Sequence, residues 1–168
     1  MDNTLKKMLY ILYQRGYRYL TKDIENVMEA HIQKPEMDDD GYWISKKKKE
    51  LPFKKIGDIR KLFGKDEPVS ISQNIDTERT FTLSDKEKQL TVIELIAPNF
   101  RWAARDRTGT FIVAETKPFK KEGSWIWHSE KPIGEMSIFN DMFKMVKWED
   151  EKPIGLNKLV QKVRKGEL

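Results

Sequence analysis

The stretch that decides the fold runs from Asn99 to Trp127 and reads NFRWAARDRTGTFIVAETKPFKKEGSWIW. A weaker version of it, GYRYLTKDIENVMEAHIQKPEMDDDGYWI, already runs from Gly16 to Ile44. An offset of 83 residues, with a later slip of one residue, superposes Arg18 on Arg101, Asp23 on Asp106, Lys34 on Lys117, Pro35 on Pro118 and Trp43 on Trp125. This self-similarity predicts one small module written twice.

The length and composition agree with two modules. The chain has 168 residues, enough for one ordinary domain or for two of about 80 residues each. Hydrophobic residues make up 38% and charged residues 35%, which is typical of a globular chain and not of a disordered one. We therefore predict a first module over 1–72, a linker over 73–83, and a second module over 84–168 that includes a C-terminal helix.

The first copy predicts an α+β module. Apolar residues recur at helical spacing over 5–14, and aromatic and alternating residues predict a hairpin over 17–20 and 27–32. The remaining predictions for this copy are a solvated loop over 35–41, a third strand over 42–44, a hydrated lysine tip over 46–49 and a helix over 52–63.

The second copy repeats this order with clearer signals. Ser84 and Glu87 form a capping-box pattern at the start of a helix that Pro98 ends. A hairpin over 101–105 and 110–116 surrounds a turn whose glycine, Gly109, supplies a positive φ. Further predictions are a third strand over 124–127, a short helical segment over 136–143, a strand over 145–148 and a helix over 156–164. The predicted fold class is α+β: two related modules, each a helix packed on a short antiparallel β-sheet.

Charge and residue usage exclude several classes of protein. The 32 Lys and Arg against 27 Asp and Glu give a formal charge of +5, which fits an anionic partner and equally fits simple solubility. Without cysteine there are no disulfides, thiolate ligands or cysteine nucleophiles. No apolar run approaches the ~20 residues that cross a bilayer, and the N-terminus lacks a secretory signal. We expect no membrane association and a cytoplasmic location.

The sequence offers no recognisable reaction centre. It contains no nucleophile elbow, phosphate-binding loop or dinucleotide fingerprint. Its two histidines, His31 and His128, form no metal-ligand cluster, and we expect His31 to be a satisfied or exposed strand residue. We expect the acids Asp106, Glu115 and Glu122 to form surface ion pairs. The sequence therefore predicts a protein without enzymatic activity, metal or cofactor.

A basic and aromatic set of residues is the best candidate for binding. Its members are Arg18, Lys22, Trp43, Arg101, Arg105, Arg107, Lys117, Trp125 and Trp127. On a strand, Arg101, Ala103 and Arg105 share one face, which predicts a guanidinium-rich surface suited to phosphate or carboxylate. The alternative is that the aromatic residues fill two small cores and the arginines pair with Asp23, Asp106 and Glu115.

The second copy resembles a module of small accessory proteins from bacteriophages of Gram-positive bacteria. The resemblance is carried by Arg101, Ala104-Arg105-Asp106, Gly109, Glu115, Lys117-Pro118, Trp125, Phe143 and the tract Lys147 to Glu151. The first copy keeps Arg18, Asp23, Lys34-Pro35 and Trp43, but in place of the tract it has only Asp66-Glu67-Pro68. The resemblance implies a phage origin and an accessory role, and it supplies no catalytic residue.

Three functions are compatible with these features. The first is a non-enzymatic accessory protein that binds a host bacterial protein or a small anionic signal in the host cytoplasm, and so disables or redirects it in host takeover or anti-defence. The second is a nucleic-acid-binding module that contacts phosphates through arginine and lysine. The third is a self-assembling protein that pairs exposed strand edges.

Overall fold

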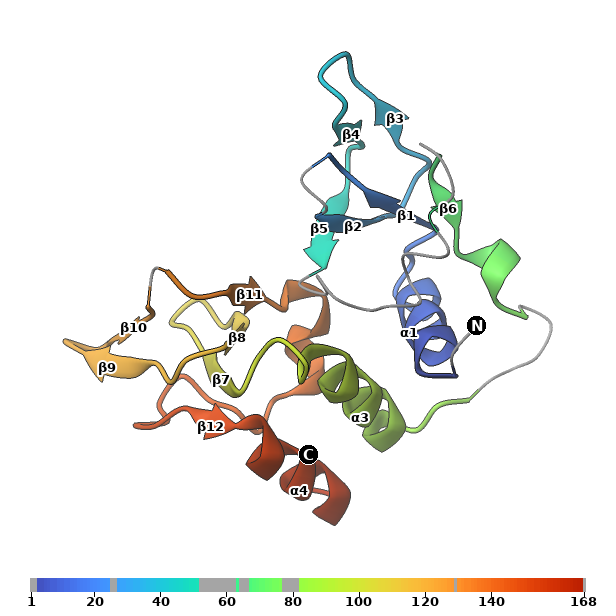
Figure 1. Ribbon diagram of the computed structural model, residues 1–168. Helices are drawn as coiled ribbons and strands as arrows, with labels where there is room; N and C mark the ends of the chain where they lie inside the picture. The colour runs from blue at the N-terminus through green and yellow to red at the C-terminus, as the bar shows by residue number, and fades with distance from the viewer. Residues whose placement is uncertain are drawn as a thin grey trace. The chain divides into compact units, whose positions relative to one another are not determined.

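The computed structural model describes residues 3–24, 27–51, 63, 67–76, 82–128 and 130–167. The chain divides into two compact units, Met1–Leu83 and Ser84–Leu168, which we call module 1 and module 2 and describe separately (Figure 1). Each combines a helix with a small antiparallel sheet, so the α+β prediction with two related modules is confirmed.

In the described part of module 1, helix α1 accompanies a four-stranded sheet. Helix α1 (Asn3–Gln14) buries one apolar face, formed by Leu5, Met8, Leu9, Ile11 and Leu12. The sheet has the order β5-β2-β1-β6, with β1 at Tyr19–Lys22, β2 at Met28–His31, β5 at Lys48–Leu51 and β6 at Val69–Ser70. A separate hairpin follows β2 and consists of β3 (Glu36–Met37) and β4 (Trp43–Ile44). A 3₁₀ turn, η1 (Ser72–Asn74), follows β6.

Module 2 has the same order of elements. Helix α3 (Asp85–Ile96) begins at a capping box. The Glu87 amide donates to the Ser84 side chain, and the Ser84 amide donates to the Glu87 carboxylate. The sheet has the order β11-β8-β7-β12, with β7 at Trp102–Arg105, β8 at Phe111–Ala114, β11 at Ile133–Glu135 and β12 at Ile154–Gly155. The separate hairpin consists of β9 (Phe119–Lys121) and β10 (Ser124–Ile126).

Two further elements complete module 2 on its helical side. They are the 3₁₀ segment η2 (Ser137–Met142) and helix α4 (Leu156–Lys165). Phe143, directly after η2, stacks on Phe111 of β8 with ring centroids 4.6 Å apart. Helix α4 buries Leu156, Leu159 and Val163, which lie at helical spacing along its inner face.

Matched hydrogen bonds show that the two sheets are equivalent residue by residue. The β1–β2 turn is closed by the Val27 amide donating to Asp23 Oδ1 at 2.8 Å, and the β7–β8 turn by the Thr110 amide donating to Asp106 Oδ1 at 2.8 Å. After the edge strands, the Ile71 amide donates to Arg18 O and the Leu156 amide to Arg101 O, each at 2.9 Å. The offset of 83 read from the sequence therefore relates the two copies of the first sheet hairpin, and an offset of 85 relates Ile71 and Leu156, which follow the edge strands.

One indole hydrogen bond attaches each hairpin to its sheet. Trp43 Nε1 donates to Lys22 O at 3.1 Å, and Trp125 Nε1 donates to Arg105 O at 2.9 Å. Both carbonyls belong to the last residue of the first sheet strand, and both indoles are buried. The hairpin loops contain Gly41 and Gly123, which have φ of 84° and 75°, a backbone conformation that glycine adopts without a steric penalty.

Several predicted elements need correction. The third strands predicted at 42–44 and 124–127 do not join the main sheets but form the separate hairpins, so the loop predicted over 35–41 contains β3. The lysine tip predicted over 46–49 overlaps β5, a paired edge strand. Residues 145–148, predicted as a strand, form turns, because the Val146 amide donates to Phe143 O and the Lys147 amide to Asp150 Oδ2. The predicted helix over 52–63 lies outside the described residues except for Phe63.

We predict that removing the indole donor loosens each hairpin. Trp43→Phe and Trp125→Phe keep an aromatic ring but leave a carbonyl without its partner, which should lower the free energy of unfolding by about 1–2 kcal/mol each. Urea denaturation measures the loss. Trp127→Phe is the matched control, because this half-buried ring follows β10 and lies outside the Trp125 bond; an equal loss in the control would contradict the prediction.

Candidate functional site

The residues predicted to bind a partner fall into groups with different surroundings. Trp43 and Trp125 are buried anchors of the hairpins. Arg18 and Arg105 donate to backbone carbonyls. The other predicted residues are Arg101, Arg107 and Lys117, which are exposed, and Lys22 and Trp127, which are half-buried.

Arg105 holds the loops of module 2 together. Its Nε donates to Val146 O at 2.7 Å, and its Nη2 donates to Phe143 O at 2.7 Å and to Asn140 O at 2.9 Å. Its Nη1 donates to Gly109 O in the β7–β8 turn. Burial lowers the pKa of Arg105, and the neighbouring carboxylate of Asp106 opposes that shift. All three guanidinium nitrogens are therefore engaged within the module.

Arg18 has a similar role in module 1. Its Nη1 donates to Tyr13 O at 2.8 Å and to Tyr17 O at 3.0 Å, and its guanidinium carbon lies 4.2 Å from the centroid of the Tyr13 ring. Arg18 thus fixes the connection between α1 and β1. Its counterpart Arg101 is exposed.

The guanidinium-rich face predicted for 101–105 does not form. Ala103 and Ala104 point to opposite faces of the strand, yet both are buried, so both faces of β7 are covered. Arg105 lies on the helical side, where the loop carbonyls surround it. The sequence pattern could show which residues share a face but not that η2 and the turns after it cover that face.

A lysine–tryptophan surface lies on module 2 instead. Lys120 Nζ lies 4.4 Å from the Trp148 ring centroid and 5.2 Å from that of Trp125, and it donates to Trp148 O. Lys117 Nζ lies 5.2 Å from the Trp102 ring centroid. The tract Lys147 to Glu151 contributes through Trp148, which lies against the hairpin lysine. Such cation–π contacts favour an ordered position for the two ammonium groups.

The outer face of the β9–β10 hairpin carries exposed apolar side chains. Phe119 and Ile126 are directly opposite each other in the register, and their exposed fractions are 51% and 39%. Lys121 and Ser124 form the next pair on this face, and both are exposed. Trp125 and Lys120 face the other way, toward the sheet and Trp148. We call Phe119, Lys121, Ser124 and Ile126 the basic hairpin face; sequence analysis missed it, because apolar identity alone predicts burial.

A buried polar cluster lies in module 1. His31 has no exposed surface; its Nε2 lies 2.7 Å from Thr21 Oγ1 and its Nδ1 lies 2.8 Å from Ser45 Oγ. Buried Glu29 has one oxygen 3.8 Å from His31 Nε2 and the other 2.9 Å from Lys48 Nζ. Burial, and secondarily the Lys48 charge, lowers the pKa of His31 to about 4. The expectation of a satisfied histidine agrees with this geometry.

The cluster brings a serine beside a histidine, which the sequence did not reveal. A hydroxyl on an imidazole is half of a nucleophile–base pair. However, a fully buried ring with a pKa near 4 is a poor general base at neutral pH. In module 2 the positions of Thr21, Glu29 and His31 are occupied by Ala104, Ile112 and Ala114, all buried. The cluster therefore replaces an apolar part of the core with a hydrogen-bonded one.

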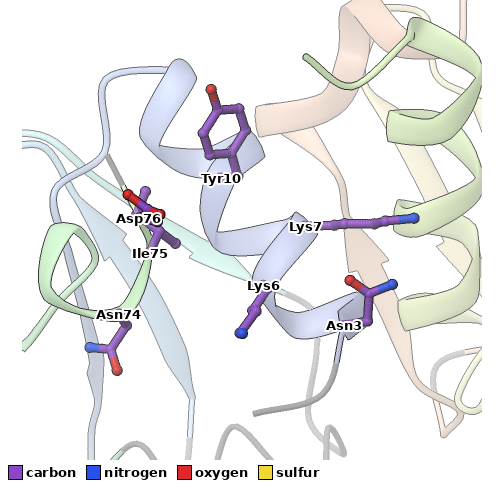
Figure 2. Close-up of a pocket in the computed structure, with 7 residues that line it drawn as sticks. All are labelled: Asn3, Lys6, Lys7, Tyr10, Asn74, Ile75 and Asp76. Atoms are coloured by element: carbon purple, nitrogen blue, oxygen red, sulfur yellow. The ribbon is translucent and has the colours of Figure 1, made fainter. Parts of the chain in front are cut away.

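A pocket of about 260 Å³ lies beside α1 in module 1. It is lined by Asn3, Lys6, Lys7, Tyr10, Asn74, Ile75 and Asp76. Figure 2 shows that the polar ends of the α1 side chains point in different directions and not toward one centre. The lining also combines the carboxylate of Asp76 with the two lysines. The lining suits neither an anion nor a cation well, so we do not take this pocket as the functional site.

Comparison with known proteins leaves the site to be interpreted from its own geometry. The chain matches no protein-family model, no curated protein sequence and no solved structure. Among the described residues, no group of three or more His, Asp or Glu could hold a metal ion, and no helix is long and apolar enough to cross a membrane.

We predict that Arg105 stabilises module 2. Arg105→Met keeps the length of the side chain but leaves carbonyls of the loops and the β7–β8 turn without donors, so the free energy of unfolding should fall by about 3 kcal/mol. Thermal or urea unfolding of the full chain measures the change. Arg101→Met, at an exposed position beside the same strand, should change stability by less than about 0.5 kcal/mol; similar losses in both variants would refute the assignment.

His31 predicts a pH-dependent stability. The unfolded chain takes up a proton near pH 6.5, whereas folded His31 takes it up near pH 4. The unfolded state therefore binds more protons between these pH values. The contribution of His31 to the free energy of unfolding is complete above about pH 6.5 and decreases by about 3 kcal/mol as the pH falls to 4. Unfolding free energies at several pH values should show a flatter profile in His31→Gln than in the wild type; parallel profiles would contradict this.

Proposed function

We propose that the chain is a non-enzymatic binding protein that contacts its partner through the basic hairpin face of module 2. One observation carries the proposal: Phe119 and Ile126 form an exposed cross-strand pair on a hairpin that is anchored from its other side by a buried tryptophan. An exposed aromatic and aliphatic pair beside charged groups is typical of the anchor residues of protein interfaces.

The anchoring makes the face suitable for binding. Trp125 fixes the hairpin to β7, and Lys120 lies between the hairpin tryptophan and Trp148. A surface that is already ordered loses less conformational entropy when it binds. The cost of ordering the hairpin therefore does not reduce the free energy that Phe119 and Ile126 contribute to binding.

The chemistry of the face favours a protein partner with an acidic rim. The face itself carries Lys121, and the segment 117–126 as a whole has three lysines and one glutamate, a net charge of +2, which attracts an acidic surface. A small anionic ligand would need several converging donors, and two of the predicted arginines, Arg18 and Arg105, are engaged with backbone carbonyls. We therefore propose a protein, in preference to a small anionic signal, as the target.

The biological role in this proposal comes from the phage resemblance of the second copy. An accessory protein of a phage acts in the host cytoplasm, so the partner would be a host bacterial protein that is disabled or redirected during host takeover or anti-defence. Nucleic acid is the alternative partner, with Lys121 of the hairpin and Lys117 just before it as the groups that contact phosphates.

Capture from a bacterial lysate tests the proposal. The immobilised wild-type chain should retain a host protein at stoichiometric amounts, and Phe119→Ser with Ile126→Ser should reduce retention at least tenfold, because truncating an interface anchor costs about 1–2 kcal/mol or more. The control is Ile133→Ser, which removes an equally exposed apolar side chain (52%) from the edge strand β11.

The outcomes separate the alternatives. Equal retention by the double variant, or no retained protein, would refute the proposed face. Retention of DNA or RNA that collapses between about 50 and 200 mM salt would instead favour phosphate contacts.

A further inference from the structure

The two hairpins share one backbone path but carry opposite charges. Segment 34–44 contains four acids and one lysine, a net charge of −3, whereas the equivalent segment 117–126 has a net charge of +2. The acids are Glu36, Asp38, Asp39 and Asp40. Duplication has therefore produced an acidic and a basic version of the same hairpin.

The outer face of the acidic hairpin is defined by the same register as that of the basic one. Glu36 is directly opposite Ile44, and two pairs further along the Asp38 amide donates to Tyr42 O. Trp43 is buried toward the sheet, so the alternating positions face outward. We call Glu36, Asp38, Tyr42 and Ile44 the acidic hairpin face; the exposed fractions of Tyr42 and Ile44 are 37% and 56%.

We infer that the acidic hairpin face of one copy binds the basic hairpin face of a second copy of this chain. Each face offers two exposed apolar side chains, Tyr42 and Ile44 on one and Phe119 and Ile126 on the other. Each also carries exposed charge of opposite sign, Glu36 on one and Lys121 on the other. Opposite potentials bring such faces together, while the apolar pairs supply surface to bury.

Like faces do not pair in this arrangement. If two basic faces met, Lys121 of one molecule would lie near Lys121 of the other. If two acidic faces met, Glu36 and Asp38 of one molecule would lie near the same residues of the other. Like-charge repulsion disfavours both contacts. Association is therefore head to tail, between different patches on the two copies.

The contact is small, which determines its strength. Four side chains on each side bury less than the ~1,200–2,000 Å² of a stable interface, so association is weak, reversible and dependent on concentration and salt. The inference rests on the proposed function, because the second copy occupies the same basic hairpin face and competes with the host partner for it. Self-association would then keep the face covered until a tighter partner displaces the second copy.

Light scattering and sedimentation of the purified full chain over a range of concentrations test the inference. The wild type should associate as concentration rises, and Glu36→Lys or Lys121→Glu should each weaken association at least tenfold. An equimolar mixture of these two variants should associate again, because a lysine at position 36 in one then meets a glutamate at position 121 in the other. Lys158→Glu, an exposed residue of α4, makes the same charge change elsewhere and should leave association intact.

A monomer at every concentration overturns the inference, as does association that neither reversal weakens or that the mixture does not restore. These results are distinct from those of the lysate experiment. Capture of a host protein by a chain that stays monomeric would support the proposed function and reject self-association. Self-association without any captured protein would support the inference and reject the proposed function.

Discussion

The hydrogen bond from a buried indole to the last carbonyl of the first sheet strand is the contact on which the rest of the structure depends. It occurs once in each module, from Trp43 to Lys22 and from Trp125 to Arg105. Without it, a hairpin of two or three residues per strand would have too little pairing to hold one orientation. With it, one face of the hairpin turns inward and the other is presented outward, so exposure of the hairpin faces follows directly from the anchor.

The two modules keep this framework while their side chains differ. Where module 1 has Thr21, Glu29 and His31, module 2 has alanine and isoleucine, and both sets are buried. Where module 1 has Lys22, module 2 has Arg105, whose guanidinium donates to carbonyls of the β7–β8 turn, of η2 and of the turns after η2. The shared path is set by backbone hydrogen bonds, turns and the indole anchor, so the remaining positions are free to adopt different chemistry.

Much of the fold could be predicted from the sequence, because its signals are local or repetitive. The capping box of α3, the apolar faces of α1 and α4, and the turn at Asp106 to Gly109 follow from neighbouring residues. The edge strands β6, β11 and β12 have only two or three residues, too few for a period, and they pair through contacts distant in sequence. The role of Arg105 was unpredictable for the same reason, since three of its four acceptors lie 35 to 41 residues away. Likewise, Phe119 is of a residue type that is usually buried, and only the orientation of its hairpin exposes it.

The distribution of the indoles makes the two modules optically distinguishable. Of the five tryptophans, only Trp43 belongs to module 1. Its ring is buried, and three of the other four, Trp102, Trp125 and Trp148, have a lysine ammonium close to the ring. Intrinsic emission of the intact polypeptide is consequently weighted toward the C-terminal half, and a chain with phenylalanine at position 43 reports on that half alone. In module 1 the tryptophan that anchors the hairpin is thus also the only indole of that module.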